Sequence, residues 1–102
     1  MENTVFICCG KNDSDKAREY AEQFKSQGAA TYIAADCGRK LNQALEALRG
    51  AVGALFILSP GFEKEIPREV FSLSIYRYAE GGFKVWFDLC GVTPRQAEDA
   101  LL

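Results

Sequence analysis

The chain has 102 residues, of which 48% are apolar and 25% charged, and its 12 basic and 14 acidic side chains nearly cancel. These values predict one globular domain over residues 1–102 and exclude a disordered chain. Basic residues are scattered rather than gathered, which argues against a nucleic-acid partner. No apolar run is long enough for a membrane partner, and no signal peptide is recognisable, so we expect a cytoplasmic protein.

The sequence contains no histidine. This excludes Ser-His-Asp and Cys-His catalysis and His-ligated metals, so any chemistry must use carboxylates, hydroxyls, thiols or backbone dipoles. The four cysteines form no C-x-x-C pair, which argues against zinc and thioredoxin-like sites. Their ordinary interpretation is as small apolar core residues. Cys9 and Cys37 lie near the ends of predicted strands and are the candidates for a reactive thiol.

The first half of the chain shows strand and helix patterns in alternation. Residues 4–9 are mostly β-branched, aromatic or sulfur-containing, which predicts a buried strand. The loop 10–14 supplies a cap for an amphipathic helix that ends at Gly28. Residues 29–35 predict a second strand, and the apolar stripe over 41–50 predicts a second helix.

The second half repeats the alternation. Residues 52–58 are apolar on both faces, as expected of a central parallel strand covered by helices on two sides. Pro67 is suited to the first turn of a third helix. Residues 83–89 predict a fourth strand at an edge, and a capping box beginning at Thr93 predicts a last helix.

The order β-α-β-α-β-α-β-α predicts right-handed crossovers and an α/β, flavodoxin-like, three-layer fold. We expect a short parallel sheet of strand order 2-1-3-4 with helices on both faces. Ligands bind such sheets beyond the carboxyl ends of the strands, at the switch point between the first and third. The loops 10–14, 36–39 and 59–69 are therefore expected around one crevice. The edge strand predicts self-association, or a last helix folded over that edge.

Several familiar occupants of this architecture are excluded by the loops. The first loop, C-G-K-N-D-S, is neither a G-x-G-x-x-G dinucleotide loop nor a P-loop. It also lacks the hydroxyl-rich character of a flavin-phosphate loop. A response-regulator receiver would need an aspartate at the end of the third strand, where this chain has Ser59.

Short motifs taken in order resemble the TIR (Toll/interleukin-1 receptor) domain over roughly residues 4–90. V-F-I-C at 5–8 is similar to the family's opening strand, and Asp36 and Gly38 match the aspartate and glycine of its mobile loop. The segment 51–61, ending in S-P-G, resembles the family's buried third strand. P-R-E-V at 67–70 resembles the W-x-x-x-E-[LI] motif, with Glu65 in place of the tryptophan. The chain looks like a compact variant of the family.

The resemblance implies a domain that binds NAD or a related nucleotide as substrate and hydrolyses its N-glycosidic bond, with no resident cofactor or metal. Nicotinamide leaves as a neutral base, so the reaction needs no general acid, only a carboxylate beside the ribose. The resemblance assigns that role to Glu69; the ordinary interpretation of a first-turn glutamate is that it complements the helix dipole. The residues expected to bind substrate are Ser59, Gly10, Lys11, Asp13, Ser14, Asp36 and Arg39.

Two alternatives stay open. The first is a non-catalytic signalling or assembly module that uses TIR-type homotypic contacts. The missing tryptophan and the short mobile loop favour this module, whereas the retained Glu69 favours an enzyme. The second is a protein similar to the nucleoside deoxyribosyltransferases, which share the β-α order and also cleave N-glycosidic bonds with a glutamate.

Overall fold

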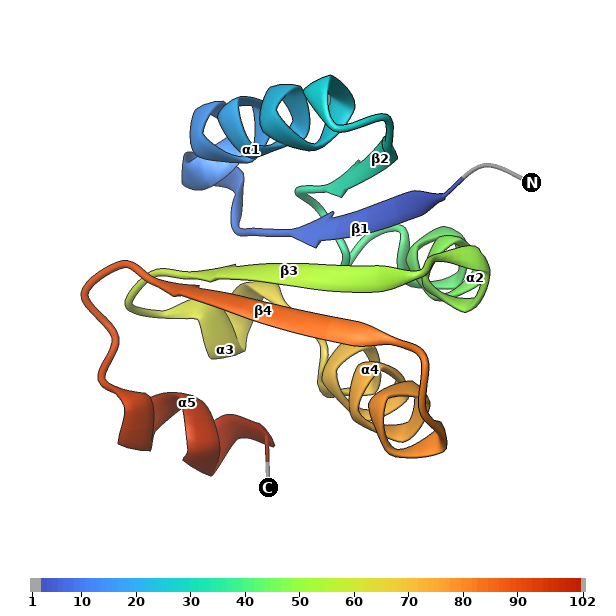
Figure 1. The fold of residues 1–102 in the computed structure, drawn as a ribbon. Helices are drawn as coiled ribbons and strands as arrows, with labels where there is room; N and C mark the ends of the chain where they lie inside the picture. The colour runs from blue at the N-terminus through green and yellow to red at the C-terminus, as the bar shows by residue number, and fades with distance from the viewer. Residues whose placement is uncertain (1–2, 102) are drawn as a thin grey trace.

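The computed structural model describes residues 3–101 and contains one sheet of four parallel strands in the order β2-β1-β3-β4 (Figure 1). The predicted fold class and strand order are confirmed. The strands are β1 (Thr4–Cys8), β2 (Ala30–Ala34), β3 (Gly53–Leu58) and β4 (Lys84–Leu89). The helices are α1 (Ser14–Ser26), α2 (Leu41–Gly50), α3 (Phe62–Glu65), α4 (Arg68–Glu80) and α5 (Pro94–Leu101), with a 3-10 turn, η1, over Lys11–Asp13.

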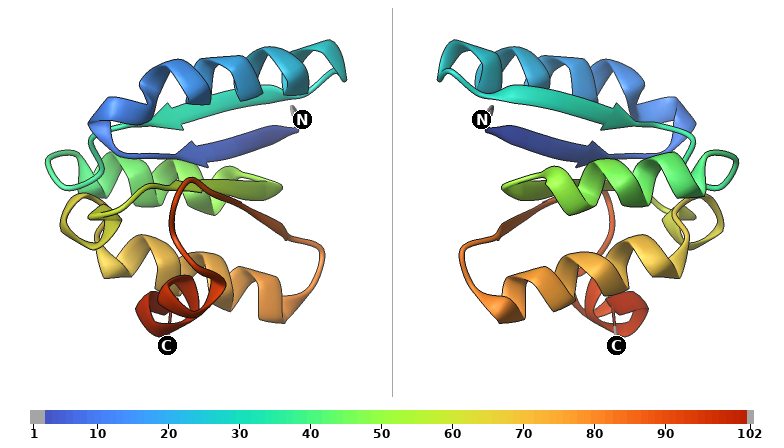
Figure 2. Two further views of the ribbon diagram at one scale, coloured as in Figure 1. Left: turned by 90° about the vertical axis from the view of Figure 1, so that its left-hand side faces the viewer. Right: turned by 90° about the vertical axis from the view of Figure 1, so that its right-hand side faces the viewer.

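The helices are divided unequally between the two faces of the sheet (Figure 2). Alternate residues of β1 and β3, such as Val5 and Leu55, pack against α1. The intervening residues, such as Phe6 and Phe56, pack against α2, α3, α4 and α5. Connections between parallel strands are right-handed, so the direction in which the chain moves across the sheet decides which face the connecting helix covers. The chain moves in one direction from β1 to β2 and in the opposite direction from β2 to β3 and from β3 to β4. Helix α1 is therefore alone on its face.

Most predicted elements agree with the structure to within a few residues, but helix α3 was not predicted. After β3, Gly61 adopts a φ of 88°, a conformation that L side chains rarely adopt, and this lets the chain turn into one helical turn. Phe62 and Ile66 anchor that turn in the core. A four-residue helix is too short to show a 3.6-residue periodicity, so the sequence pattern did not reveal it.

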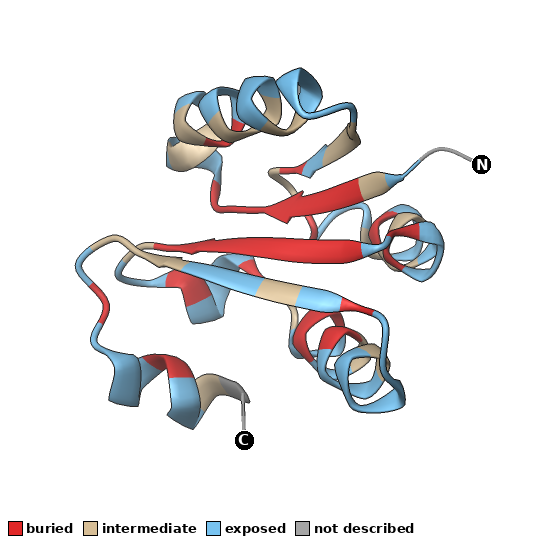
Figure 3. Ribbon diagram, viewed as in Figure 1, coloured by how far each residue is buried: buried red, intermediate tan, exposed pale blue. Residues whose placement is uncertain are grey.

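Strand β4 is one of the two edge strands of the sheet, with β2 at the other edge, and it is much less buried than β3 (Figure 3). Trp86 is 38% exposed and Phe87 39%. Trp86 lies over Gly53: a Cβ at that glycine would stand 2.8 Å from the indole ring. Helix α5 packs on the face occupied by α4 through Ala97, and Val92 in the loop before α5 packs on the same face. The α1-facing side of β4 is consequently covered only by α1.

A helix that crosses a membrane must be long and predominantly apolar. The helices within residues 3–101 do not meet both requirements.

Candidate functional site

The three predicted loops meet at the carboxyl ends of the strands, where the side chain of Glu65 lies against the first loop. The backbone N–H of Lys11 donates to Glu65 Oε1 at 3.3 Å. A Cβ at Gly10 would stand 2.2 Å from Glu65 Oε2, so the glycine makes room for this carboxylate. The backbone oxygen of Glu65 lies 3.9 Å from the Cβ position of Gly38, in the loop after β2. Glu65 therefore contributes a carboxylate to the predicted crevice.

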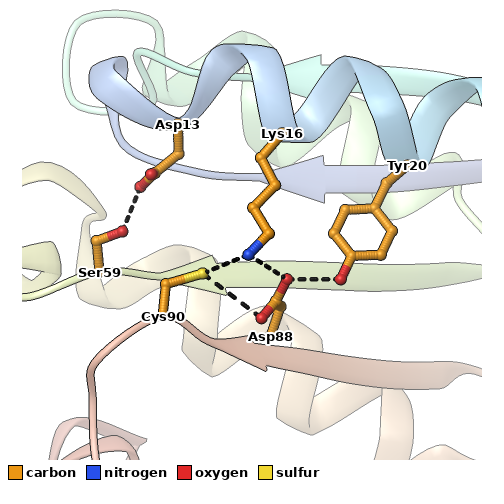
Figure 4. A network of polar contacts seen from close by, with 6 residues as sticks. All are labelled: Asp13, Lys16, Tyr20, Ser59, Asp88 and Cys90. Atoms are coloured by element: carbon orange, nitrogen blue, oxygen red, sulfur yellow. Dashed lines mark hydrogen bonds and ion pairs between the residues drawn. The ribbon is translucent and has the colours of Figure 1, made fainter.

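The hydroxyl groups expected to bind substrate are hydrogen-bonded within the protein. Ser59 Oγ donates to Asp13 Oδ2 at 2.6 Å, which ties the end of β3 to the first loop (Figure 4). Ser14 Oγ donates to the carbonyl oxygen of Lys11 at 2.8 Å. The structure thus brings together the first loop and Ser59, as the sequence predicts, and uses these groups to hold the loops in place.

The remaining predicted residues form no hydrogen bond or ion pair with this cluster in residues 3–101. Asp36 and Arg39 form an ion pair with Nε and Oδ2 3.9 Å apart, and the arginine side chain is 79% exposed. Such an exposed pair contributes little to stability. Glu69 is exposed in the first turn of α4, and its side chain makes no hydrogen bond or ion pair within residues 3–101. No hydrogen bond or ion pair in that range joins the Glu69 side chain to Ser59 or to the first loop.

A second polar cluster joins α1 to the end of β4, and the sequence analysis did not identify it (Figure 4). Tyr20 Oη donates to Asp88 Oδ2 at 2.5 Å. Lys16 Nζ lies 3.1 Å from the same oxygen and 3.0 Å from Cys90 Sγ. Cys90 Sγ is in turn 3.5 Å from Asp88 Oδ1. Asp88 is the centre of this cluster because its two oxygens contact all three partners.

The cluster fixes the charge of its members at neutral pH. The hydrogen bond from Tyr20 lowers the pKa of Asp88, with Lys16 acting in the same direction, so the carboxylate stays ionised. The same hydrogen bond raises the pKa of Tyr20 and keeps the phenol protonated. Hydrogen bonds to Cys90 and Asp88 raise the pKa of Lys16, which stays positively charged.

A cavity of about 350 Å³ lies between α1 and β4, beside this cluster. We call it the α1–β4 groove. Its aromatic lining includes Phe24 and Trp86, whose ring centroids are 5.5 Å apart. Its volume is in the range of small-molecule sites, which combine apolar walls with a few polar groups. The lining residues are Tyr20, Gln23, Phe24, Gln27, Leu55, Trp86, Phe87, Asp88 and Leu89.

The sequence contains one signal that could have indicated this groove. Tyr20 and Phe24 fit the apolar stripe of a helix, and Trp86 fits a strand, so these three predict ordinary packing. Asp88 is different, because it is an acidic residue that follows three apolar residues, 85–87, and precedes Leu89. A carboxylate at such a position needs a polar partner, and that partner is on α1.

Comparison with known proteins identifies no relative of this chain. No protein-family model, curated protein or solved structure matches the chain. Among the described residues, no group of three or more His, Cys, Asp or Glu side chains is placed to hold a metal ion. The TIR resemblance and the nucleotide substrate stay predictions from the sequence.

Proposed function

We propose that this protein binds NAD or a related nucleotide and that the α1–β4 groove holds one of its planar rings. The observation that carries this proposal is the aromatic lining of the groove together with an ionised carboxylate at its end. Phe24 and Trp86 offer ring faces and edges for stacking. The amides of Gln23 and Gln27 offer both donors and acceptors to a base or to a carboxamide group.

The polar cluster beside the groove suits the remainder of a nucleotide. Asp88 accepts hydrogen bonds and can take them from ribose hydroxyls, since its charge is maintained by Tyr20 and Lys16. Lys16 lies near the start of α1, where both its charge and the helix dipole favour a phosphate. A nucleotide in this orientation would point its ring toward Trp86 and its phosphates toward the carboxyl edge of the sheet.

Cleavage of the N-glycosidic bond requires a carboxylate beside the ribose, to stabilise positive charge in the transition state. Asp88 lines the groove, whereas Glu69 does not. In our proposal, Asp88 therefore takes the role that the sequence motif assigns to Glu69. The nicotinamide ring would leave as a neutral base, and water would add to the sugar.

Trp86 makes this proposal directly testable, because it is the single tryptophan of the chain and lines the groove. We expect NAD to change the fluorescence of Trp86 in a saturable manner.

Removal of one stacking ring in Phe24→Ala should weaken binding roughly tenfold. Asp88→Asn should lower the rate of nicotinamide release by about 10²–10³. Release is measured by separating nicotinamide from NAD in timed samples.

Glu69→Gln is the matched control, since it also replaces one carboxylate by an amide but lies outside the groove. We expect it to bind NAD and release nicotinamide as the wild type does. Loss of release in Glu69→Gln alone would move the site to the crevice that the sequence predicts. An unchanged Trp86 signal at millimolar NAD, with no release, would contradict nucleotide binding. Release of the free base from a purine or pyrimidine deoxyribonucleoside, measured in timed samples in the same way, tests the deoxyribosyltransferase-like alternative.

A second candidate function, an assembly module, is favoured by the unpaired edge of β4. That edge lies beside exposed Trp86 and Phe87, and α4 exposes Ile75, Tyr76 and Tyr78. An open strand edge is a template for pairing with another chain. Light scattering over a wide concentration range should then show a mass that rises with concentration. A strictly monomeric mass at every concentration would contradict this candidate.

A further inference from the structure

Cys8 and Cys37 form a buried pair of thiols that neither proposed function uses. Their sulfur atoms are 3.4 Å apart, and the residues are 0% and 2% exposed. Cys8 is the last residue of β1, and Cys37 lies in the turn after β2, the strand beside β1. We propose that this pair is an oxidation site, which a hydroperoxide converts into an intramolecular Cys8–Cys37 disulfide.

The two thiols are not equivalent. Cys37 donates to the carbonyl oxygen of Ala34 at 3.6 Å, and Cys8 can donate to Cys37. The hydrogen bond from Cys8 lowers the pKa of Cys37, and the same bond raises that of Cys8. The thiolate, the form that attacks peroxides, therefore develops on Cys37. At Cys9, burial and the nearby Asp13 raise the pKa to about 11, which keeps this thiol protonated and slow to react.

Access to the pair also favours Cys37. A cavity of about 230 Å³ is lined by Cys37 and includes Asp36, Lys40 and Gln43 but not Cys8. Hydrogen peroxide is little larger than water and fits such a cavity. The negative charge of Asp36 in the lining opposes a thiolate at Cys37, but the hydrogen bond from Cys8 has the larger effect and lowers the pKa of Cys37. A peroxide molecule that enters this cavity thus meets Cys37 first.

The reaction has two steps. The Cys37 thiolate attacks one peroxide oxygen, the O–O bond breaks, and the departing hydroxide takes the proton of Cys8 and leaves as water. Cys37 is then a sulfenic acid. The Cys8 thiolate attacks its sulfur, the S–O bond breaks, and the hydroxide takes up a proton from solvent as a second water. Overall, two thiols are oxidised to one disulfide and one peroxide is reduced to two waters. The proton taken up from solvent in the second step equals the proton that the Cys37 thiol released when it became a thiolate.

Disulfide formation requires the sulfurs to approach from 3.4 Å to about 2.05 Å. Cys8 is held in β1 between two neighbouring strands, so the turn that carries Cys37 must supply most of this movement. The disulfide would join positions 29 residues apart, which restricts the unfolded chain. We therefore expect the oxidised protein to unfold at a higher temperature than the reduced protein and to return to the lower value with a thiol reductant.

The test treats folded protein with hydrogen peroxide, blocks remaining thiols under denaturing conditions and maps the peptides by mass spectrometry. We expect the Cys8–Cys37 peptide pair to appear while Cys9 remains blockable. Cys90, whose sulfur contacts Lys16 and Asp88 rather than another thiol, should appear in no intramolecular disulfide. Cys9→Ala and Cys90→Ala should leave its formation unchanged. In Cys8→Ala, Cys37 should accumulate as a sulfenic acid that dimedone traps.

Three results would overturn the proposal. The first is an intramolecular disulfide of Cys9 or Cys90 that forms as fast as the Cys8–Cys37 disulfide, because the site would then have no selectivity. The second is a disulfide that forms only under denaturing conditions. The third is a wild-type protein whose Cys8 and Cys37 both stay reduced at peroxide concentrations that oxidise a free cysteine peptide. The first and third readouts use wild-type protein, so they hold even if a variant fails to fold.

Discussion

Phe56→Ala is expected to lower the free energy of unfolding by about 3–5 kcal/mol. Phe56 is fully buried in the central strand β3, with ring centroids 4.9 Å from Phe71 of α4 and 5.6 Å from Phe87 of β4. Truncation removes a large apolar side chain and leaves a cavity that rigid neighbours fill only in part. Domains are stable by only about 5–15 kcal/mol, so much of the total is lost. Urea denaturation followed by circular dichroism measures the change.

Phe87→Ala is the matched control, because it removes the other ring of the same stacked pair. Phe87 is 39% exposed, so less apolar area returns to water and the space left opens to solvent. We expect a loss of less than half that of Phe56→Ala. Equal losses in the two variants would mean that the core is not centred on β3.

The second large effect is expected for Arg77→Met, which removes a cation from between α2 and α4. Arg77 Nη1 donates to the carbonyl oxygen of Leu48 at 2.8 Å and to that of Ala51, at the end of α2. The guanidinium also lies 4.4 Å from the ring centroid of Phe83. Methionine keeps most of the apolar stem but leaves the carbonyl of Ala51 without this donor, which costs about 1.5–3 kcal/mol. Thermal and urea unfolding both report this loss.

Arg49→Met provides the comparison at the same end of α2. Arg49 makes one ion pair, to Glu46 at 3.4 Å, and the two side chains are 64% and 79% exposed. Solvent screens such a pair, so its removal should change stability by less than about 0.5 kcal/mol. A loss as large as that of Arg77→Met would show that any positive charge near the end of α2 is sufficient.

The fold could be predicted from the sequence because local patterns and chain order point to the same architecture. Every residue in 52–58 is apolar or glycine, so both faces of a strand over this range would be apolar, which indicates a strand covered on both faces. Alternation with helices then leaves few topologies, since crossovers are right-handed. The strand starts at Gly53 rather than at residue 52, although the backbone of Val52 already hydrogen-bonds to Thr4 and Lys84 on the two neighbouring strands.

The candidate site could be predicted only in part. Chain order was sufficient to bring Ser59 to Asp13, because the carboxyl ends of adjacent parallel strands meet. The approach of Glu65 to Gly10 depends on the single turn of α3, which has no periodic signal. The α1–β4 groove stays open because α5 packs on the opposite face of the sheet, where Ala97 is buried in the core. Such long-range packing is not encoded in any short window of sequence.

The strand order also has a consequence for synthesis on the ribosome. β1 is the first strand to emerge, yet it lies inside the sheet and pairs with β2 on one edge and β3 on the other. Its second partner starts only at Gly53, so at typical translation rates this edge stays unpaired for roughly 2–9 s after β1 is made. During that interval the nascent chain exposes an apolar strand edge of the kind that chaperones protect.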